Sequence, residues 1–191
     1  MKQGRRIFSM LILSGFMALV LACWPQQAQA ANTADDILGA ATHQAAEQHK
    51  IVFFEFGASW CSQCRRLERF LADPANAPII QKYFVLSDVH VQEKHGKHPE
   101  LETPGAEKML EGFGGTEGVP FIVFVNTDGK ALATSNRPVD GKSRGENIGY
   151  PDAPEEIDWF MTMLHKSVPT MSADEAATLE TSLKAKSTSK H

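Results

Sequence analysis

The residues best suited to chemistry in this sequence are two cysteines three positions apart, in the run Cys61-Ser62-Gln63-Cys64. They follow an apolar run at 51–56 that is typical of a buried strand, and they open a segment at 61–71 with the apolar spacing of a helix. Unpaired N–H groups and the positive end of the helix dipole favour a thiolate at Cys61. A thiolate attacks disulfides, and Cys64, which is expected to be shielded one turn further into the helix, can then attack the mixed disulfide that forms on Cys61. The spacing therefore predicts thiol–disulfide exchange.

A C-x-x-C pair can also have three other roles. Half of a zinc site needs a second such pair, and the sequence after residue 30 contains none. A haem attachment motif has His after the second Cys, where this chain has Arg65. A purely structural disulfide remains open as an alternative. The position between a strand and a helix favours the redox role.

The first thirty residues have the layout of a secretory signal peptide. Three basic residues precede an apolar run at 7–22, which is shorter than the about 20 residues that a membrane span needs. Cleavage is predicted after Ala30, in the small-x-small run Ala28-Gln29-Ala30. An uncleaved anchor is one alternative, and lipidation at Cys23, which ends a loose lipobox, is another. We therefore expect a periplasmic or otherwise extracytoplasmic protein, where disulfide chemistry is permitted.

Length and composition limit the number of domains and the classes of protein to which the chain can belong. The protein has 191 residues, of which 42% are hydrophobic and 22% charged, as in a single globular domain with a little left over. Three cysteines are too few for a disulfide-stapled scaffold. Residues 31–191 carry 16 Lys and Arg against 23 Asp and Glu, a net charge of −7. This acidic balance excludes the basic surface that a nucleic-acid-binding protein needs, and it gives the protein no electrostatic reason to bind anionic lipid.

Apolar periodicity and turn residues predict nine elements around the cysteines. Helices are expected at 32–50, 61–71, 104–113, 154–168 and 173–184, and strands at 51–56, 83–91, 121–125 and 130–134. Segments 90–103 and 137–151 are polar or rich in glycine, so they are predicted to be loops. In this order the elements imply a mixed sheet with helices on its faces.

Two motifs resemble those of the thioredoxin family. The run from Phe53 to Cys64 looks like the family's active-site strand, turn and helix. The run Gly118-Val119-Pro120, followed by the strand at 121–125, looks like its cis-proline segment. The resemblance covers roughly residues 33–168. It implies an α/β, thioredoxin-like fold with a central mixed sheet flanked by helices. The predicted domains are the signal peptide at 1–30, a thioredoxin-like domain at 31–168 and a helical extension with a frayed end at 169–191.

The resemblance implies roles for four further residues. Pro120 would be cis and would place the Val119 backbone beside Cys61, to hold a substrate chain as an added strand. Glu55 would be a buried carboxylate beneath the cysteines that accepts the proton of Cys64 through water, and burial in an apolar strand would raise its pKa. Trp60 would flank the site as a contact surface. The open alternatives are a trans bond at Pro120, an exposed carboxylate at Glu55 and simple packing of Trp60.

The chain departs from the best-known members of the family between its cysteines. Ser62 and Gln63 stand where reducing thioredoxins have Gly-Pro and where strong oxidants have His before the second Cys. These two residues help to set the redox potential, and each could donate a hydrogen bond to the thiolate. The direction of electron flow, reductase or oxidase and isomerase, is therefore left open.

The predicted partners follow from this chemistry. We expect exported proteins with thiols or disulfides as substrates, and a redox partner that recycles the cysteine pair. No cofactor is expected, because the pair itself carries the electrons. His90, His95 and His98 suggest a copper site, but a solvated loop is the preferred interpretation and no metal is predicted. The alternative function is a non-catalytic binding module or copper chaperone on the same fold.

Overall fold

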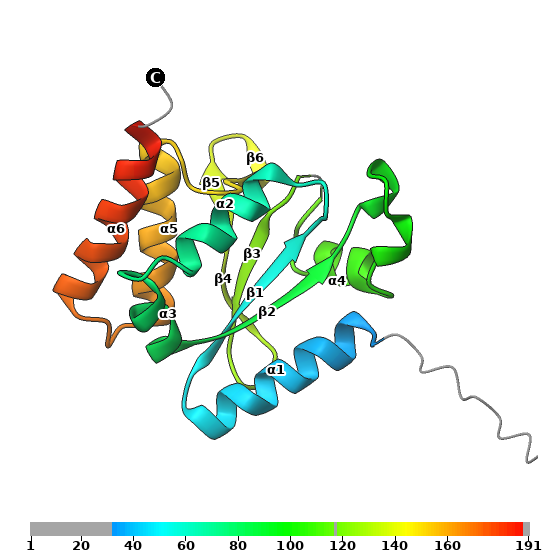
Figure 1. The fold of residues 1–191 in the computed structure, drawn as a ribbon, viewed down its shortest axis with the longest axis horizontal. Helices are drawn as coiled ribbons and strands as arrows, with labels where there is room; N and C mark the ends of the chain where they lie inside the picture. Colours follow the sequence, from blue (N-terminus) through cyan, green and yellow to red (C-terminus); the bar gives the residue numbers. More distant parts are fainter. Residues whose placement is uncertain (1–31, 117, 189–191) are drawn as a thin grey trace, which may run out of the picture. The chain divides into compact units, whose positions relative to one another are not determined.

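The computed structural model describes residues 32–116 and 118–188. The predicted signal peptide, its cleavage site and Cys23 lie outside these residues. Within the described ranges, no helix has the length and apolar character that crossing a membrane requires. Figure 1 shows the elements, which in chain order are α1 (Ala34–Gln48), β1 (Ile51–Gly57), α2 (Ser62–Leu71), α3 (Ala77–Tyr83), β2 (Phe84–His90), η1 (Glu93–His95), η2 (Pro99–Leu101), α4 (Ala106–Gly112), β3 (Phe121–Val125), β4 (Ala131–Thr134), β5 (Asn136–Val139), β6 (Lys142–Asn147), α5 (Pro154–Ser167) and α6 (Ala173–Thr188).

The central sheet has four strands in the order β2-β1-β3-β4. Strand β1 is parallel to β2, with Ile51 opposite Phe84, and antiparallel to β3, with Val52 opposite Val125. Strands β3 and β4 form the predicted antiparallel hairpin. The sheet is therefore mixed, and helices pack on it, which confirms the predicted fold class.

Strand β1 is buried on both faces of the sheet. Val52, Phe54 and Phe56 belong to a core shared with α1 and α4. Phe53 points to the opposite face, into a second core that contains residues of α2, α5 and α6. Each fully buried side chain of this size contributes on the order of 2–3 kcal/mol to stability. Because successive side chains alternate along a strand, Glu55 lies on the same face as Phe53, beneath α2.

Helix α3 and the strands β5 and β6 were not predicted. Helix α3 follows the pair Asp73-Pro74, where the Asp73 carbonyl oxygen accepts the N–H groups of Asn76 and Ala77 at 2.9 and 2.8 Å. Its seven residues are too few to show a helical period. Strands β5 and β6 form a second, two-stranded sheet where a loop was expected at 137–151. None of their side chains is fully buried, and no apolar alternation marks them in the sequence.

Two other segments differ from their predictions in extent or in setting. Residues 90–103 were expected to form a solvated loop, but the structure places η1 and η2 there and buries the side chain of Glu93 completely. Helix α6 was expected to end near residue 184, and it continues to Thr188. A capping box starts it, since the Glu175 carboxylate accepts the Ser172 N–H at 3.0 Å and the Ser172 hydroxyl oxygen accepts the Glu175 N–H at 3.3 Å.

Candidate active site

The two cysteines lie at the amino end of α2, directly after the turn that leaves β1. Cys61 caps the helix, and its Sγ accepts the backbone N–H of Cys64 at 2.9 Å. The N–H of Cys61 donates to the carbonyl oxygen of Ala58 at 2.9 Å, which closes the turn. The two sulfurs form a disulfide, so the structure shows the oxidised form of the pair.

Burial does not distinguish the two cysteines as the sequence led us to expect. Both are 3% exposed, although Cys64 was predicted to be the shielded one. What separates them is their surroundings. Cys61 Sγ lies 3.4 Å from the carbonyl oxygen of Val119, whereas Cys64 lines a pocket beneath α2 that also contains Glu55.

The peptide bond between Val119 and Pro120 is cis, as predicted. The side-chain amide of Asn147, on β6, donates to the carbonyl oxygens of Gly118 and Pro120 at 3.0 and 3.1 Å. The Asn147 carbonyl oxygen in turn accepts the hydroxyl of Ser135 at 2.8 Å. The unpredicted second sheet therefore supports the proline loop that faces Cys61.

Glu55 is buried beneath the cysteines, with only 8% of its surface exposed. Burial, followed by the negative charges of Asp88 and Glu68, raises the pKa of this carboxyl group to about 8. A Cβ placed on Gly57 would lie 3.3 Å from Glu55 Oε1 and 3.6 Å from Cys64 Sγ. Because Gly57 has no side chain, the space between the carboxyl group and the sulfur stays open. The expected buried carboxylate is thus present and next to Cys64.

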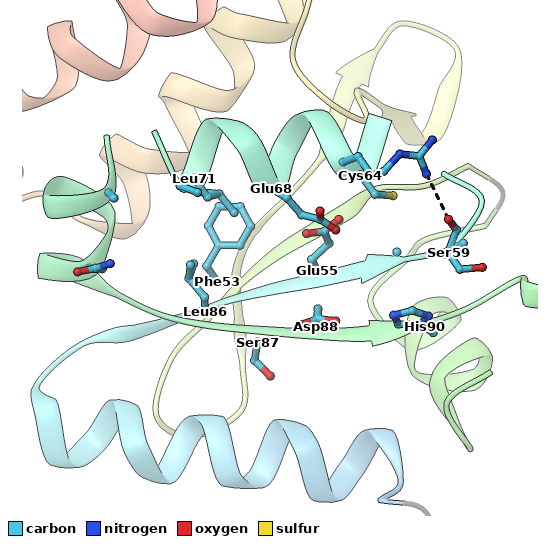
Figure 2. A pocket seen from close by; sticks show the side chains of 16 residues that line it. Phe53, Glu55, Ser59, Cys64, Glu68, Leu71, Leu86, Ser87, Asp88 and His90 are labelled. Carbon is cyan, nitrogen blue, oxygen red and sulfur yellow. Dashed lines mark hydrogen bonds between the residues drawn. The ribbon is translucent and has the colours of Figure 1, made fainter. Parts of the chain in front are cut away.

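The pocket beneath α2 has a volume of about 720 Å³. Figure 2 shows Glu55 rising from β1 toward Glu68 on α2, with the sulfur of Cys64 at the end of the same helix. Asp88 contributes from the neighbouring strand β2. The pocket gives Glu55 and Cys64 access to water, which a proton transfer through solvent requires.

Glu93, which no motif or apolar period in the sequence marks, holds the turn before Cys61. The Glu93 carboxylate accepts the N–H of Ser59 at 2.6 Å and its hydroxyl at 2.7 Å. The indole N–H of Trp60 donates to the carbonyl oxygen of Gln92 at 2.9 Å. Trp60 itself is 40% exposed, so part of its ring remains open as a contact surface.

The residues between and after the cysteines make contacts of their own. The Gln63 side-chain oxygen accepts from Arg66 at 3.0 Å, and the oxidised pair receives no hydrogen bond from the side chain of Ser62 or Gln63 in the described structure. Arg66 pairs with Asp152 at 2.7 Å and lies over the ring of Tyr150. Arg65 donates to the carbonyl oxygen of Ser59 at 3.2 Å (Figure 2).

The three histidines of the predicted loop do not converge. His90 Nδ1 lies 2.7 Å from Glu93 Oε1, His95 faces the ring of Trp60, and His98 Nδ1 lies 3.0 Å from Glu100 Oε1. Among the described residues, no group of three or more His, Cys, Asp or Glu side chains is placed to hold a metal ion.

A family model described as a thioredoxin-like domain matches residues 38–136, just over half of the chain. Solved structures with a similar fold include a disulphide isomerase from Xylella fastidiosa Temecula1, at 21% identity and a TM-score of 0.43, covering 77% of this chain and 86% of that one. Another is the carboxy-terminal domain of DsbD from Neisseria meningitidis in its oxidised form, at 23% identity and a TM-score of 0.34, covering 50% of this chain and 75% of that one. A comparison with curated proteins finds no match. From its family match and its Cys61–Cys64 pair, the chain belongs to the family of thioredoxin-like domains and is a thiol–disulfide oxidoreductase of that type.

Proposed function

We propose that this protein is exported and exchanges disulfides with client proteins through the run Cys61-Ser62-Gln63-Cys64. The observation that carries the proposal is the position of the Cys61 sulfur, which caps α2 and accepts the N–H of Cys64. A donor aimed at this sulfur at a helix amino terminus stabilises a thiolate, and the thiolate is the attacking species in disulfide exchange.

In the reducing direction, the Cys61 thiolate attacks one sulfur of a client disulfide. The client S–S bond breaks, a mixed disulfide forms on Cys61, and the other client sulfur leaves as a thiolate that takes up a proton. Cys64 then loses its proton and attacks the Cys61 sulfur, which re-forms the Cys61–Cys64 disulfide and releases the second client thiol. Two electrons pass from the cysteine pair to the client, and the oxidising direction reverses each step.

Glu55 is proposed to exchange the proton of Cys64 through water in the pocket beneath α2. Its pKa of about 8 is close to the ordinary thiol value of about 8.5, so a proton moves between the two groups at little cost. The open space at Gly57 lies between the two groups and supports this route.

Val119 and Trp60 are proposed to hold the client chain. The Val119 carbonyl oxygen faces the Cys61 sulfur at 3.4 Å, where a client strand could pair with the loop around Pro120. Trp60 offers a partly exposed ring on the amino side of the same sulfur. Clients would be exported proteins with thiols or disulfides, and a separate redox partner would recycle the pair. The chemistry needs no cofactor, because the sulfurs themselves carry the electrons.

Export rests on the sequence before residue 31. We propose a signal peptide at 1–30 with cleavage after Ala30, or lipidation at Cys23, and hence a periplasmic or otherwise extracytoplasmic location. The thioredoxin-like domain at 31–168 and the helical extension at 169–191 are likewise proposed. Amino-terminal sequencing and mass measurement of the mature protein distinguish the two kinds of processing.

The exchange mechanism predicts a stable adduct when its second step is removed. In Cys64→Ala, Cys61 still attacks but nothing resolves the mixed disulfide, so clients should accumulate as covalent adducts that a reductant releases. Electrophoresis without reductant, followed by mass spectrometry of the linked peptides, identifies the joined cysteines. The matched control is Cys61→Ala, which should form few or no adducts. Equal labelling of the two variants, or none with any exported protein, would contradict the proposal and favour a non-catalytic binding module.

The direction of electron flow follows from the potential of the pair. Equilibration of the protein with a glutathione series gives this value directly. A potential of about −270 mV, as in thioredoxin, makes the protein a reductase that needs an electron supply. A potential of about −120 mV makes it a donor of disulfides, and that outcome would support a stabilising effect of Ser62 and Gln63 on the thiolate.

A further inference from the structure

Glu93 is a buried carboxylate that the exchange mechanism does not use. Its side chain is fully buried, at 0% exposure, in the short helix η1. Both carboxylate oxygens are occupied by Ser59, one by its N–H at 2.6 Å and the other by its hydroxyl at 2.7 Å. Removing a carboxylate from water is costly unless strong hydrogen bonds compensate. The bonds that compensate here lead to the turn immediately before Cys61.

Further contacts within the segment around Glu93 fix the position of its carboxylate. The two oxygens of Glu102 accept the N–H groups of Gln92 and Glu93 at 3.2 and 2.7 Å. His90 Nδ1 lies 2.7 Å from Glu93 Oε1, and the N–H of His90 donates to the hydroxyl of Thr103 at 3.0 Å. These contacts tie both ends of the segment 92–102 to the end of β2, so the position of Glu93 is fixed by its own surroundings.

The same segment also encloses Trp60. The Trp60 indole N–H donates to the carbonyl oxygen of Gln92 at 2.9 Å. Gly96 packs against the indole ring so closely that a Cβ there would lie 2.5 Å from Trp60 Cδ1. Two consecutive residues before the nucleophile, Ser59 and Trp60, are therefore held by one segment from a distant part of the chain.

We propose that Glu93 is a positioning residue of the active site, which fixes the Ser59–Trp60 turn and thereby aims the Cys61 sulfur for attack. Hydrogen bonds to an ionised acceptor are about twice as strong as neutral ones. Burial alone would raise the pKa of Glu93, but the bonds from Ser59 and the contact with His90 outweigh burial and lower it, so the acceptor is ionised at neutral pH. A nucleophile that is held in place loses little rate to misorientation. This inference rests on the proposed exchange function.

The test compares the rate at which the reduced full-length protein reacts with glutathione disulfide. In this reaction Cys61 displaces one glutathione thiolate, and Cys64 displaces the second. In Glu93→Gln the amide oxygen can still accept the Ser59 N–H, but the amide nitrogen can only donate, so the bond with the Ser59 hydroxyl must reverse and neither bond is charge-assisted. We expect the rate constant to fall about tenfold, with a changed dependence on pH. The matched control is Glu100→Gln, an exposed carboxylate in the same segment whose side chain lies 3.0 Å from His98 Nδ1 and makes no hydrogen bond to Ser59.

A second variant separates positioning from a general loss of structure. Ser59→Ala removes the hydroxyl bond but leaves the N–H, so the rate should fall about threefold. In the Glu93→Gln background the same change should add little, because the two residues act through one contact. If Glu93→Gln does not fold, the rate constant of Ser59→Ala alone decides whether the contact between Glu93 and Ser59 positions Cys61.

Three results would overturn the inference. The first is a folded Glu93→Gln protein with the wild-type rate and pH profile. The second is a double variant in which the separate effects of Glu93→Gln and Ser59→Ala on the rate constant multiply. The third is a Ser59→Ala protein with an unchanged rate. A wild-type protein that does not react with glutathione disulfide contradicts the proposed function itself, and the inference falls with it.

Discussion

Glu55 carries a protonated carboxyl group beneath Cys64 at neutral pH, because its pKa of about 8 lies above the surrounding pH. The unfolded chain has no such environment, and there the group titrates near its ordinary value of 4.5. Between these two values the folded protein holds a proton that the unfolded chain has lost. The free energy of unfolding therefore falls as the pH rises from about 4.5 to about 8.

Replacing Glu55 with Gln removes this titration. We expect the stability of the wild type relative to Glu55→Gln to fall, on the order of 4 kcal/mol, from below pH 4.5 to above pH 8. Urea unfolding of both proteins in the disulfide form, across this range, measures the difference without interference from the thiols. Curves that run parallel over the whole range would show that Glu55 is not the buried acid described above.

Part of the active site could be predicted from the sequence and part could not. Cys61, Cys64 and Glu55 lie within ten residues of one another, so a local pattern contains them. Pro120 was found through a second local motif. The contact between Glu93 and Ser59 joins residues 34 apart, and it exists only because β2 runs beside β1. No apolar period or motif marks such a contact.

At the scale of elements, strands β1 and β3 were predicted from apolar runs, and β2 from apolar residues that alternate with polar positions. The hairpin of β5 and β6 was missed because none of its side chains is fully buried, so it shows neither pattern. Its importance comes from one side chain, Asn147, whose amide supports the loop that faces Cys61. A peripheral sheet thus supports the loop that is proposed to hold the client chain.

Replacing Asn147 with Ala leaves the carbonyl oxygens of Gly118 and Pro120 without this donor. We expect KM for a client disulfide to rise about tenfold, because the loop loses two hydrogen bonds and each contributes about 0.5–1.5 kcal/mol. The equilibrium of the cysteine pair with glutathione should stay unchanged, since the pair itself is not touched. Steady-state kinetics and the glutathione titration give the two values. Ser143→Ala, an exposed position on the same strand, is the control, and equal KM values for the two variants would count against this role.

At the scale of the whole molecule, α6 completes a core that begins at β1. Leu179 and Leu183 are fully buried in the same cluster as Phe53. Polar contacts join α6 to α3 as well, since Asn76 donates to the hydroxyl of Ser182 at 2.9 Å and Lys82 pairs with Glu175 at 2.7 Å. The unpredicted helix α3 is therefore the element through which the carboxy-terminal helix contacts the region after the active site.

Replacing Leu183 with Ala tests whether α6 belongs to the cooperative folding unit. Loss of a fully buried leucine should lower the free energy of unfolding by about 2–5 kcal/mol. The potential of the cysteine pair should not change, because the substitution lies in the core away from the sulfurs. Urea unfolding followed by circular dichroism measures the loss, with the exposed Thr181→Ala as the control. A cost under about 0.5 kcal/mol would mean that α6 unfolds separately.

The place of α6 in the core also has a consequence for biosynthesis. The ribosome makes this helix after every other element described here, at about 5–20 residues per second. The core around Leu179 and Leu183 cannot close before then, so this core stays open for on the order of ten seconds of synthesis. The proposed signal peptide at 1–30 would act on the chain during that interval, before this core has packed.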